Sequence, residues 1–69
     1  MGNSDIGKSI MERRNELGIT QSHLAELSDV SVNTVYKIER GQANPSLNVL
    51  IKILDVIGME IKMEVKKKF

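Results

Sequence analysis

Residues 19–47 of this 69-residue chain read ITQSHLAELSDVSVNTVYKIERGQANPSL. Thr20 and Ser31 have the side chains that cap helix N-termini, because a hydroxyl oxygen there accepts a hydrogen bond from a backbone N–H of the first turn. Apolar residues follow each cap at helical spacing, and only a few residues separate the two segments. The stretch therefore predicts two short helices joined by a tight turn, the first ending near Ser28 and the second ending at Gly41.

A further helix is predicted before this stretch. Ile6, Ile10 and Leu17 share one helical stripe, which indicates a helix over about residues 5–17. Gly18 then suits the position just past a helix end, where a left-handed backbone conformation costs a glycine nothing.

A last helix is predicted over residues 46–57, because Pro45 suits a helix start and Gly58 a helix stop. Apolar side chains cover most of its surface. One apolar stripe is assigned to the core of the domain and consists of Leu47, Leu50, Leu54 and Ile57. A second stripe is assigned to a subunit interface and consists of Val49, Ile53 and Val56. The alternative is a helix that is buried on nearly all sides.

The hydrophobic period changes after Gly58. Apolar and charged residues alternate strictly over residues 59–66, which predicts a β-strand. The chain has no second predicted strand, so we expect this one to pair with the same segment of another copy. Antiparallel pairing about Met63 places oppositely charged residues opposite each other, 62 against 64 and 60 against 66. The apolar interface residues of this strand are Met59, Ile61, Met63 and Val65.

Two alternatives exist for this end of the chain, a final helical turn and a frayed tail. Residues 67–69 are expected to be a disordered tail.

Composition narrows the classes of protein. A 69-residue chain with 41% hydrophobic residues builds one modest core, and with no cysteine and one histidine it has neither disulfides nor a metal site to support it. Self-association is therefore expected. The chain has no apolar run of about 20 residues and no secretion signal in residues 1–9, so we expect a cytoplasmic protein without a membrane partner.

The functional inventory disfavours an enzyme. The chain has no cysteine nucleophile and no glycine-rich phosphate loop, and His23 has no carboxylate or metal companion at a fixed spacing. We therefore predict no catalytic residue, no cofactor and no metal. Two aromatic residues are too few for stacking on single strands or RNA. The net charge of +1 means that any surface for duplex DNA must be a local basic patch.

The order of helix, tight turn and helix over residues 21–40 resembles the Xre and phage-repressor (Cro and C1 type) helix-turn-helix proteins. The resemblance implies an all-α, repressor-like DNA-binding domain of four to five helices over residues 1–58, followed by a dimerisation strand at 59–66. It departs from the family at Asp29, where glycine is general because the backbone commonly needs a positive φ. Aspartate tolerates this conformation better than most residues.

The resemblance also implies a function, sequence-specific binding of double-stranded DNA by a homodimer that represses transcription from a palindromic operator. The expected base-reading residues are Val32, Asn33 and Lys37, since asparagine can bind adenine, lysine the guanine acceptors and valine a thymine methyl. The expected phosphate-contacting residues are Gln21, Thr34, Tyr36, Arg40, Gln42 and Asn44. For each of these residues the alternative is an ordinary solvated side chain.

Two further expectations depend on resemblance. Arg14 and Glu39 match the family's internal ion pair between the first and third helices, and a free Arg14 on phosphate is the alternative. The segment PSLNVLIKILDVIGMEIKMEVK, residues 45–66, resembles the end of the HipB-like antitoxins. It implies an alternative function in which the chain holds a kinase toxin inactive and represses its own operon. A pairing module without DNA affinity is a further alternative.

Overall fold

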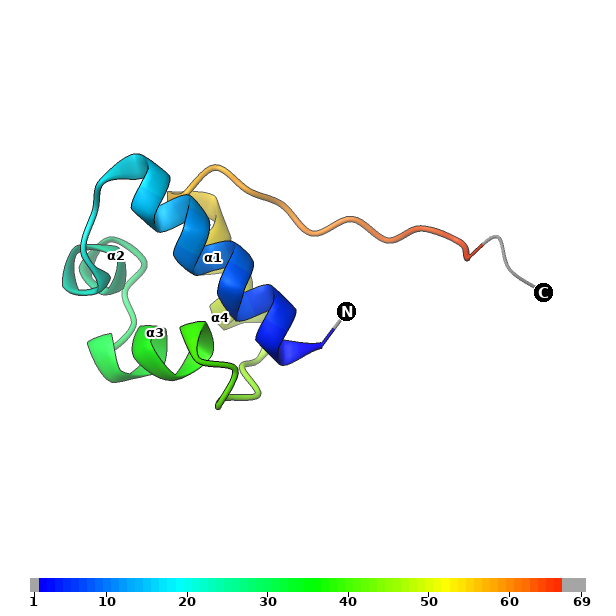
Figure 1. The fold of residues 1–69 in the computed structure, drawn as a ribbon, viewed down its shortest axis with the longest axis horizontal. Helices are drawn as coiled ribbons and strands as arrows, with labels where there is room; N and C mark the ends of the chain where they lie inside the picture. Colours follow the sequence, from blue (N-terminus) through cyan, green and yellow to red (C-terminus); the bar gives the residue numbers. More distant parts are fainter. Residues whose placement is uncertain (1, 67–69) are drawn as a thin grey trace.

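The computed structural model describes residues 2–66, which form four α-helices (Figure 1). These are α1 (Asn3–Leu17), α2 (Gln21–Leu27), α3 (Val32–Glu39) and α4 (Leu47–Val56). The predicted all-helical class is confirmed. None of these four helices is long and apolar enough to cross a bilayer. The predicted disordered tail, residues 67–69, lies outside the described residues.

The helix ends follow the capping residues of the sequence. The Thr20 hydroxyl accepts a hydrogen bond from the His23 backbone N–H (3.0 Å), and the Ser31 hydroxyl accepts one from that of Thr34 (3.1 Å). Gly18 follows α1 with a left-handed φ of 71°. These caps satisfy backbone groups that a helix terminus leaves without partners, and they fix α2 and α3 where the sequence predicts them.

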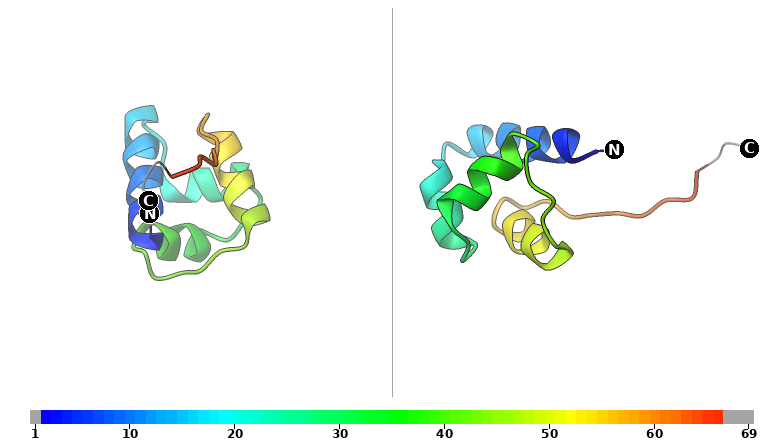
Figure 2. Two further views of the ribbon diagram at one scale, coloured as in Figure 1. Left: turned by 90° about the vertical axis from the view of Figure 1, so that its right-hand side faces the viewer. Right: turned by 90° about the horizontal axis from the view of Figure 1, so that it is seen from below.

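The helices pack around one small core (Figure 2). α1 and α2 both pack against α3, and α2 also packs against α4. The core side chains have less than a tenth of their surface exposed, and they are Ile10, Leu24, Ala25, Val35, Ile38, Ile53, Leu54 and Ile57. Each helix contributes to this core, so the packing of all four determines where the outer face of α3 lies.

Gly7 sets the distance between α1 and α3. It is buried, and a Cβ atom at this position would overlap the backbone carbonyl oxygen of Ile38. Only glycine lets the two backbones approach this closely. The apolar periodicity of α1 gave no sign of this contact.

The structure corrects two assignments of apolar residues on α4. Ile53 has no exposed surface and lies in the core of its own domain, so the predicted subunit contact through Ile53 is wrong. Leu47, predicted to lie in the core, is 60% exposed. Val49 and Val56 are partly buried against the core. The direction in which α4 crosses the domain decides these outcomes, and periodicity alone does not fix it.

Within residues 2–66 the structure contains no β-strand, so the predicted strand is not seen. The segment 59–66, called the tail from here on, runs out beyond the helices (Figure 1). A strand needs a neighbouring strand for its backbone hydrogen bonds, and a single copy offers none. Met59 packs against the core, whereas Met63 is 92% and Val65 89% exposed.

Candidate nucleic-acid interface

The outer face of α3 carries a cluster of exposed side chains. Helical geometry of about 100° per residue spreads this cluster over an arc of roughly 140°. Its members, the α3 face, are Val32, Asn33, Tyr36, Lys37 and Arg40. On the opposite side of the helix, Val35 and Ile38 are buried. The exposed side carries the three expected base readers, and the buried Val35 and Ile38 hold the helix against the core.

The three predicted base readers all belong to this face. Val32 is the first residue of α3 and is 47% exposed, and Asn33 and Lys37 are exposed one and five residues later. Val32 and Asn33 come from the first turn of α3, the part that reaches base edges in helix-turn-helix proteins, whereas Lys37 lies in the last turn. The structure thus places all three on the exposed side of α3.

Tyr36 and Arg40 form a pair on the α3 face. The Arg40 guanidinium carbon lies 5.3 Å from the centre of the Tyr36 ring, a separation typical of a cation–π contact. The ring restricts where the guanidinium can go. The predicted phosphate contacts at these two positions are therefore coupled to each other.

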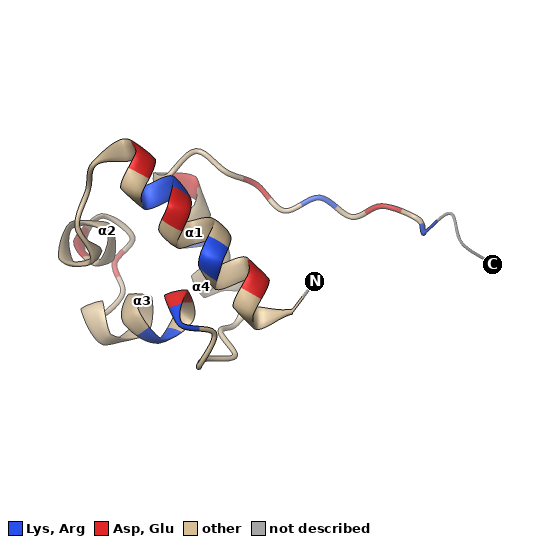
Figure 3. Cartoon of the chain, viewed as in Figure 1, with Lys and Arg blue, Asp and Glu red and all other residues tan. Residues whose placement is uncertain are grey.

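The other residues predicted to contact phosphate differ in how exposed they are. Thr34 is half-buried, and its hydroxyl lies 2.8 Å from that of Ser31, so it takes part in the capping of α3. Gln42 and Asn44 are exposed in the loop between α3 and α4. This loop follows the end of α3 that carries Lys37 in its last turn and Arg40 as its C-cap, and Figure 3 shows Lys and Arg positions in blue at this end of α3.

Arg14 and Glu39 form the predicted ion pair. The guanidinium donates through Nε to Glu39 Oε2 (2.7 Å) and through Nη2 to Oε1 (3.0 Å), and Nη1 donates to the Ile19 carbonyl oxygen (2.9 Å). The hydrogen bond to Glu39 raises the pKa of Arg14. Raising a pKa favours the charged form at every pH below it, so this contribution to stability persists through the neutral range.

Gln21 joins this ion pair, a contact that the sequence did not predict. Its Nε2 donates to Glu39 Oε1 at 2.9 Å. One amide hydrogen is therefore committed to Glu39, and the second remains for a phosphate. The network ties α1, the first residue of α2 and the last residue of α3 together, so it fixes the orientation of the α3 face.

The turn between α2 and α3 contains the residue at which the sequence departs from the family pattern. Asp29 has a φ of 58°, as expected for this position, and is exposed. The next backbone N–H, that of Val30, donates to the carbonyl oxygen of Ala25 (3.0 Å) and closes the turn. Aspartate therefore takes the left-handed conformation here and places its carboxylate at the surface beside α3.

Two adjacent helices joined by a tight turn, with the second exposed along its outer face, define a helix-turn-helix domain. The helix-turn-helix family model matches residues 10–62. The chain therefore belongs to this family, of the Xre-like type.

Similar proteins are found among regulators of transcription. A candidate HTH-type transcriptional regulatory protein of Methanococcus vannielii is 44% identical over 55 residues, which cover 80% of this chain and 17% of that protein. An uncharacterized HTH-type transcriptional regulator of Haemophilus influenzae is 38% identical over 56 residues, covering 81% of this chain and 57% of the relative. The chain thus spans about a sixth of the archaeal relative and somewhat over half of the bacterial one.

A solved structure has the same fold. The restriction-modification controller protein C.AhdI of Aeromonas hydrophila superimposes with a TM-score of 0.80 at 33% sequence identity, over 84% of this chain and 88% of that protein.

Proposed function

We propose that this protein is a sequence-specific regulator of transcription that binds double-stranded DNA as a homodimer and represses from a palindromic operator. The observation that carries the proposal is the α3 face, where Val32, Asn33 and Lys37 point outward from a helix held by the core. The relatives named as transcriptional regulators and the controller protein of the same fold support this function.

The proposed mechanism places α3 in the major groove. Asn33 pairs with an adenine edge, Lys37 donates to guanine acceptors and Val32 packs on a thymine methyl, each worth roughly 1–3 kcal/mol of discrimination. Arg40, Gln42 and Asn44, with the free N–H of Gln21, hold phosphates and set the register. The ion pair of Arg14 with Glu39 keeps the helix at a fixed angle to the groove.

A two-fold symmetric dimer presents two such helices. If their spacing matches one turn of the duplex, about 34 Å, both half-sites of a palindrome are read at once. The proposed contact surface between the copies consists of Val49, Val56, Met59, Ile61, Met63 and Val65, without the buried Ile53. Occupation of promoter DNA by this dimer then blocks transcription.

Selection from a random duplex library tests the proposal. The intact chain is expected to retain a palindromic sequence, while Asn33→Ala and Lys37→Ala each lose preference at particular positions. Lys8→Ala is the matched control, because Lys8 is also an exposed lysine but lies on α1. The base-reading roles are wrong if both α3 variants select the same sequence as the unaltered chain.

The antitoxin alternative depends on a strand shared between subunits. Residues 2–66 contain no strand in the single chain, so a kinase toxin as second partner stays a prediction. Copurification of a kinase with the tagged chain would support it.

A further inference from the structure

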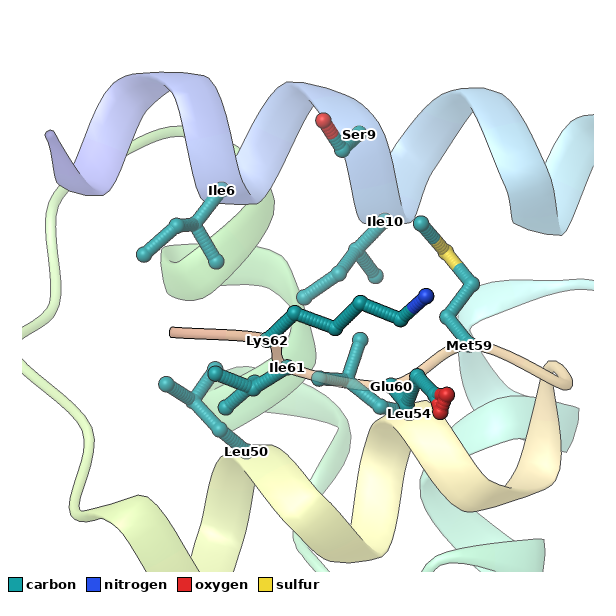
Figure 4. Close-up of a pocket in the computed structure, with 9 residues that line it drawn as sticks. All are labelled: Ile6, Ser9, Ile10, Leu50, Leu54, Met59, Glu60, Ile61 and Lys62. Atoms are coloured by element: carbon teal, nitrogen blue, oxygen red, sulfur yellow. The ribbon is translucent and has the colours of Figure 1, made fainter. Parts of the chain in front are cut away.

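An apolar groove runs between α1 and α4, beside the tail. It has a volume of about 230 Å³, and Figure 4 shows the side chains of α1, α4 and the tail that surround it. Its apolar lining consists of Ile6, Ile10, Leu50, Leu54, Met59 and Ile61, and Glu60 and Lys62 of the tail also line it. Ser9 lies on the α1 wall of the groove. The DNA-binding function proposed above leaves this groove unused, because it lies away from the α3 face.

The tail fills only part of this groove. Met59 packs against the core and Ile61 lines the groove, although Ile61 is still 48% exposed. Further along, Met63 and Val65 extend past it and lie in water, with 92% and 89% of their surface exposed. Alternate residues of a paired β-strand point to the same side, so pairing as a strand would bring these four side chains onto one face. Paired in this way, the tail continues the apolar face of the groove beyond its own domain.

Antiparallel pairing of two tails brings this exposed face back to a groove. With Met63 opposite its own copy, Ile61 of one chain is opposite Val65 of the other, and directly opposed side chains lie on the same face, roughly 5 Å apart. The partner's Val65 therefore lies beside Ile61. We infer that the groove between α1 and α4 is a docking site for a second copy of this chain, filled by Val65 of the partner subunit. This inference rests on the homodimer of the proposed function.

The charged residues of the tail favour the same register. Lys62 is then opposite Glu64 of the partner subunit, and Glu60 is opposite Lys66 of the partner subunit. A parallel arrangement in register would instead place each charge opposite its like, which destabilises the pair. Charge complementarity thus selects a second copy in the antiparallel direction as the occupant. Each subunit completes the groove of the other.

Disulfide trapping tests the docking site, because the natural chain has no cysteine. Chains with Ser9→Cys are mixed with chains carrying Val65→Cys under a mild oxidant, and the mixed disulfide is expected. Ser9→Cys changes one atom of a half-buried residue, so it preserves the fold. Lys8→Cys is the matched control, since Lys8 is adjacent on α1 but exposed and does not line the groove. A third variant, Met63→Cys, is expected to form a disulfide with its own copy.

The three variants separate the possible outcomes. In one outcome Met63→Cys forms a disulfide with its own copy, but Ser9→Cys gives no more mixed disulfide with Val65→Cys than Lys8→Cys does. This outcome would overturn the docking site and leave the pairing of the tails intact. Absence of both products would overturn the docking site together with dimerisation through the tails, and the DNA selection experiment would still judge the α3 face separately. As a second measurement, Val65→Gln should weaken dimerisation in sedimentation at least about tenfold, whereas Lys8→Gln, at an exposed position outside both the groove and the tail, should not.

Discussion

Replacement of Arg14 by alanine tests the network that holds the α3 face. The Glu39 side chain is 2% exposed, and the variant leaves it without the guanidinium that binds both of its oxygens. Removal of one partner of a buried ion pair costs about 3–5 kcal/mol. Gln21 still donates one hydrogen bond to Glu39, so we expect a loss near the lower end, about 3 kcal/mol. A domain of this size has a free energy of unfolding of roughly 3–10 kcal/mol, so the loss is a large share of the total.

Urea denaturation followed by circular dichroism measures this loss. All variants are compared at one protein concentration, because the proposed dimerisation would change the apparent stability. Glu16→Ala is the control, since it removes an exposed ion pair with Arg13 that is worth about 0–1 kcal/mol. Joint replacement, Arg14→Met with Glu39→Leu, should recover most of the stability, because no charge is then left buried without a partner. A loss below about 1 kcal/mol in Arg14→Ala would refute the reasoning.

Three further predictions concern single positions. Gly7→Ala should lower the free energy of unfolding by about 1–3 kcal/mol in the same urea assay, because the new methyl group overlaps the Ile38 carbonyl; an unchanged transition midpoint would contradict the close approach. Asp29→Gly should raise the free energy of unfolding by about 0.5–1 kcal/mol, because glycine adopts the positive φ without cost; a lower value would show that the carboxylate has a structural role. The same variant should bind DNA more tightly in a fluorescence titration, because it removes a negative charge. Tyr36→Leu should weaken DNA binding about 2–5-fold, because the ring that holds the Arg40 guanidinium is lost, while Tyr36→Phe should not. In an Arg40→Ala background Tyr36→Leu should no longer weaken binding; a loss of affinity in Tyr36→Phe would show instead that Tyr36 contacts phosphate through its hydroxyl.

Local signals in the sequence predicted much of this fold. Thr20 and Ser31 cap helices where expected, and Gly18 follows α1 in the left-handed conformation, because each of these outcomes depends on a few neighbouring residues. The helical spacing of apolar residues after Ser31 located α3 in the same way. The pairing of Arg14 with Glu39 was accessible only through the resemblance to a family, since 25 residues separate them.

Features that depend on how helices cross were not predictable. Ile53 and Leu47 are both apolar residues of α4, yet one is fully buried and the other mostly exposed, because the packing of α4 against α2 decides which stripe faces inward. The contact of Gln21 with Glu39 requires the beginning of α2 to meet the end of α3. Similarly, Arg13 donates to the Ile57 carbonyl oxygen at the end of α4, 44 residues away. None of these contacts leaves a periodic trace in the sequence.

The glycine contact between α1 and α3 bears on how a binding site must be shaped. With its backbone pressed against α1 at Gly7 and its last residue bound to both neighbouring helices, α3 has little freedom to tilt or slide. When the shapes of protein and duplex do not match, the duplex must therefore deform. It bends, twists or narrows its grooves, and the energy of this deformation varies with base sequence. Under the proposed function, duplex sites are therefore expected to differ in affinity through base pairs that no side chain touches.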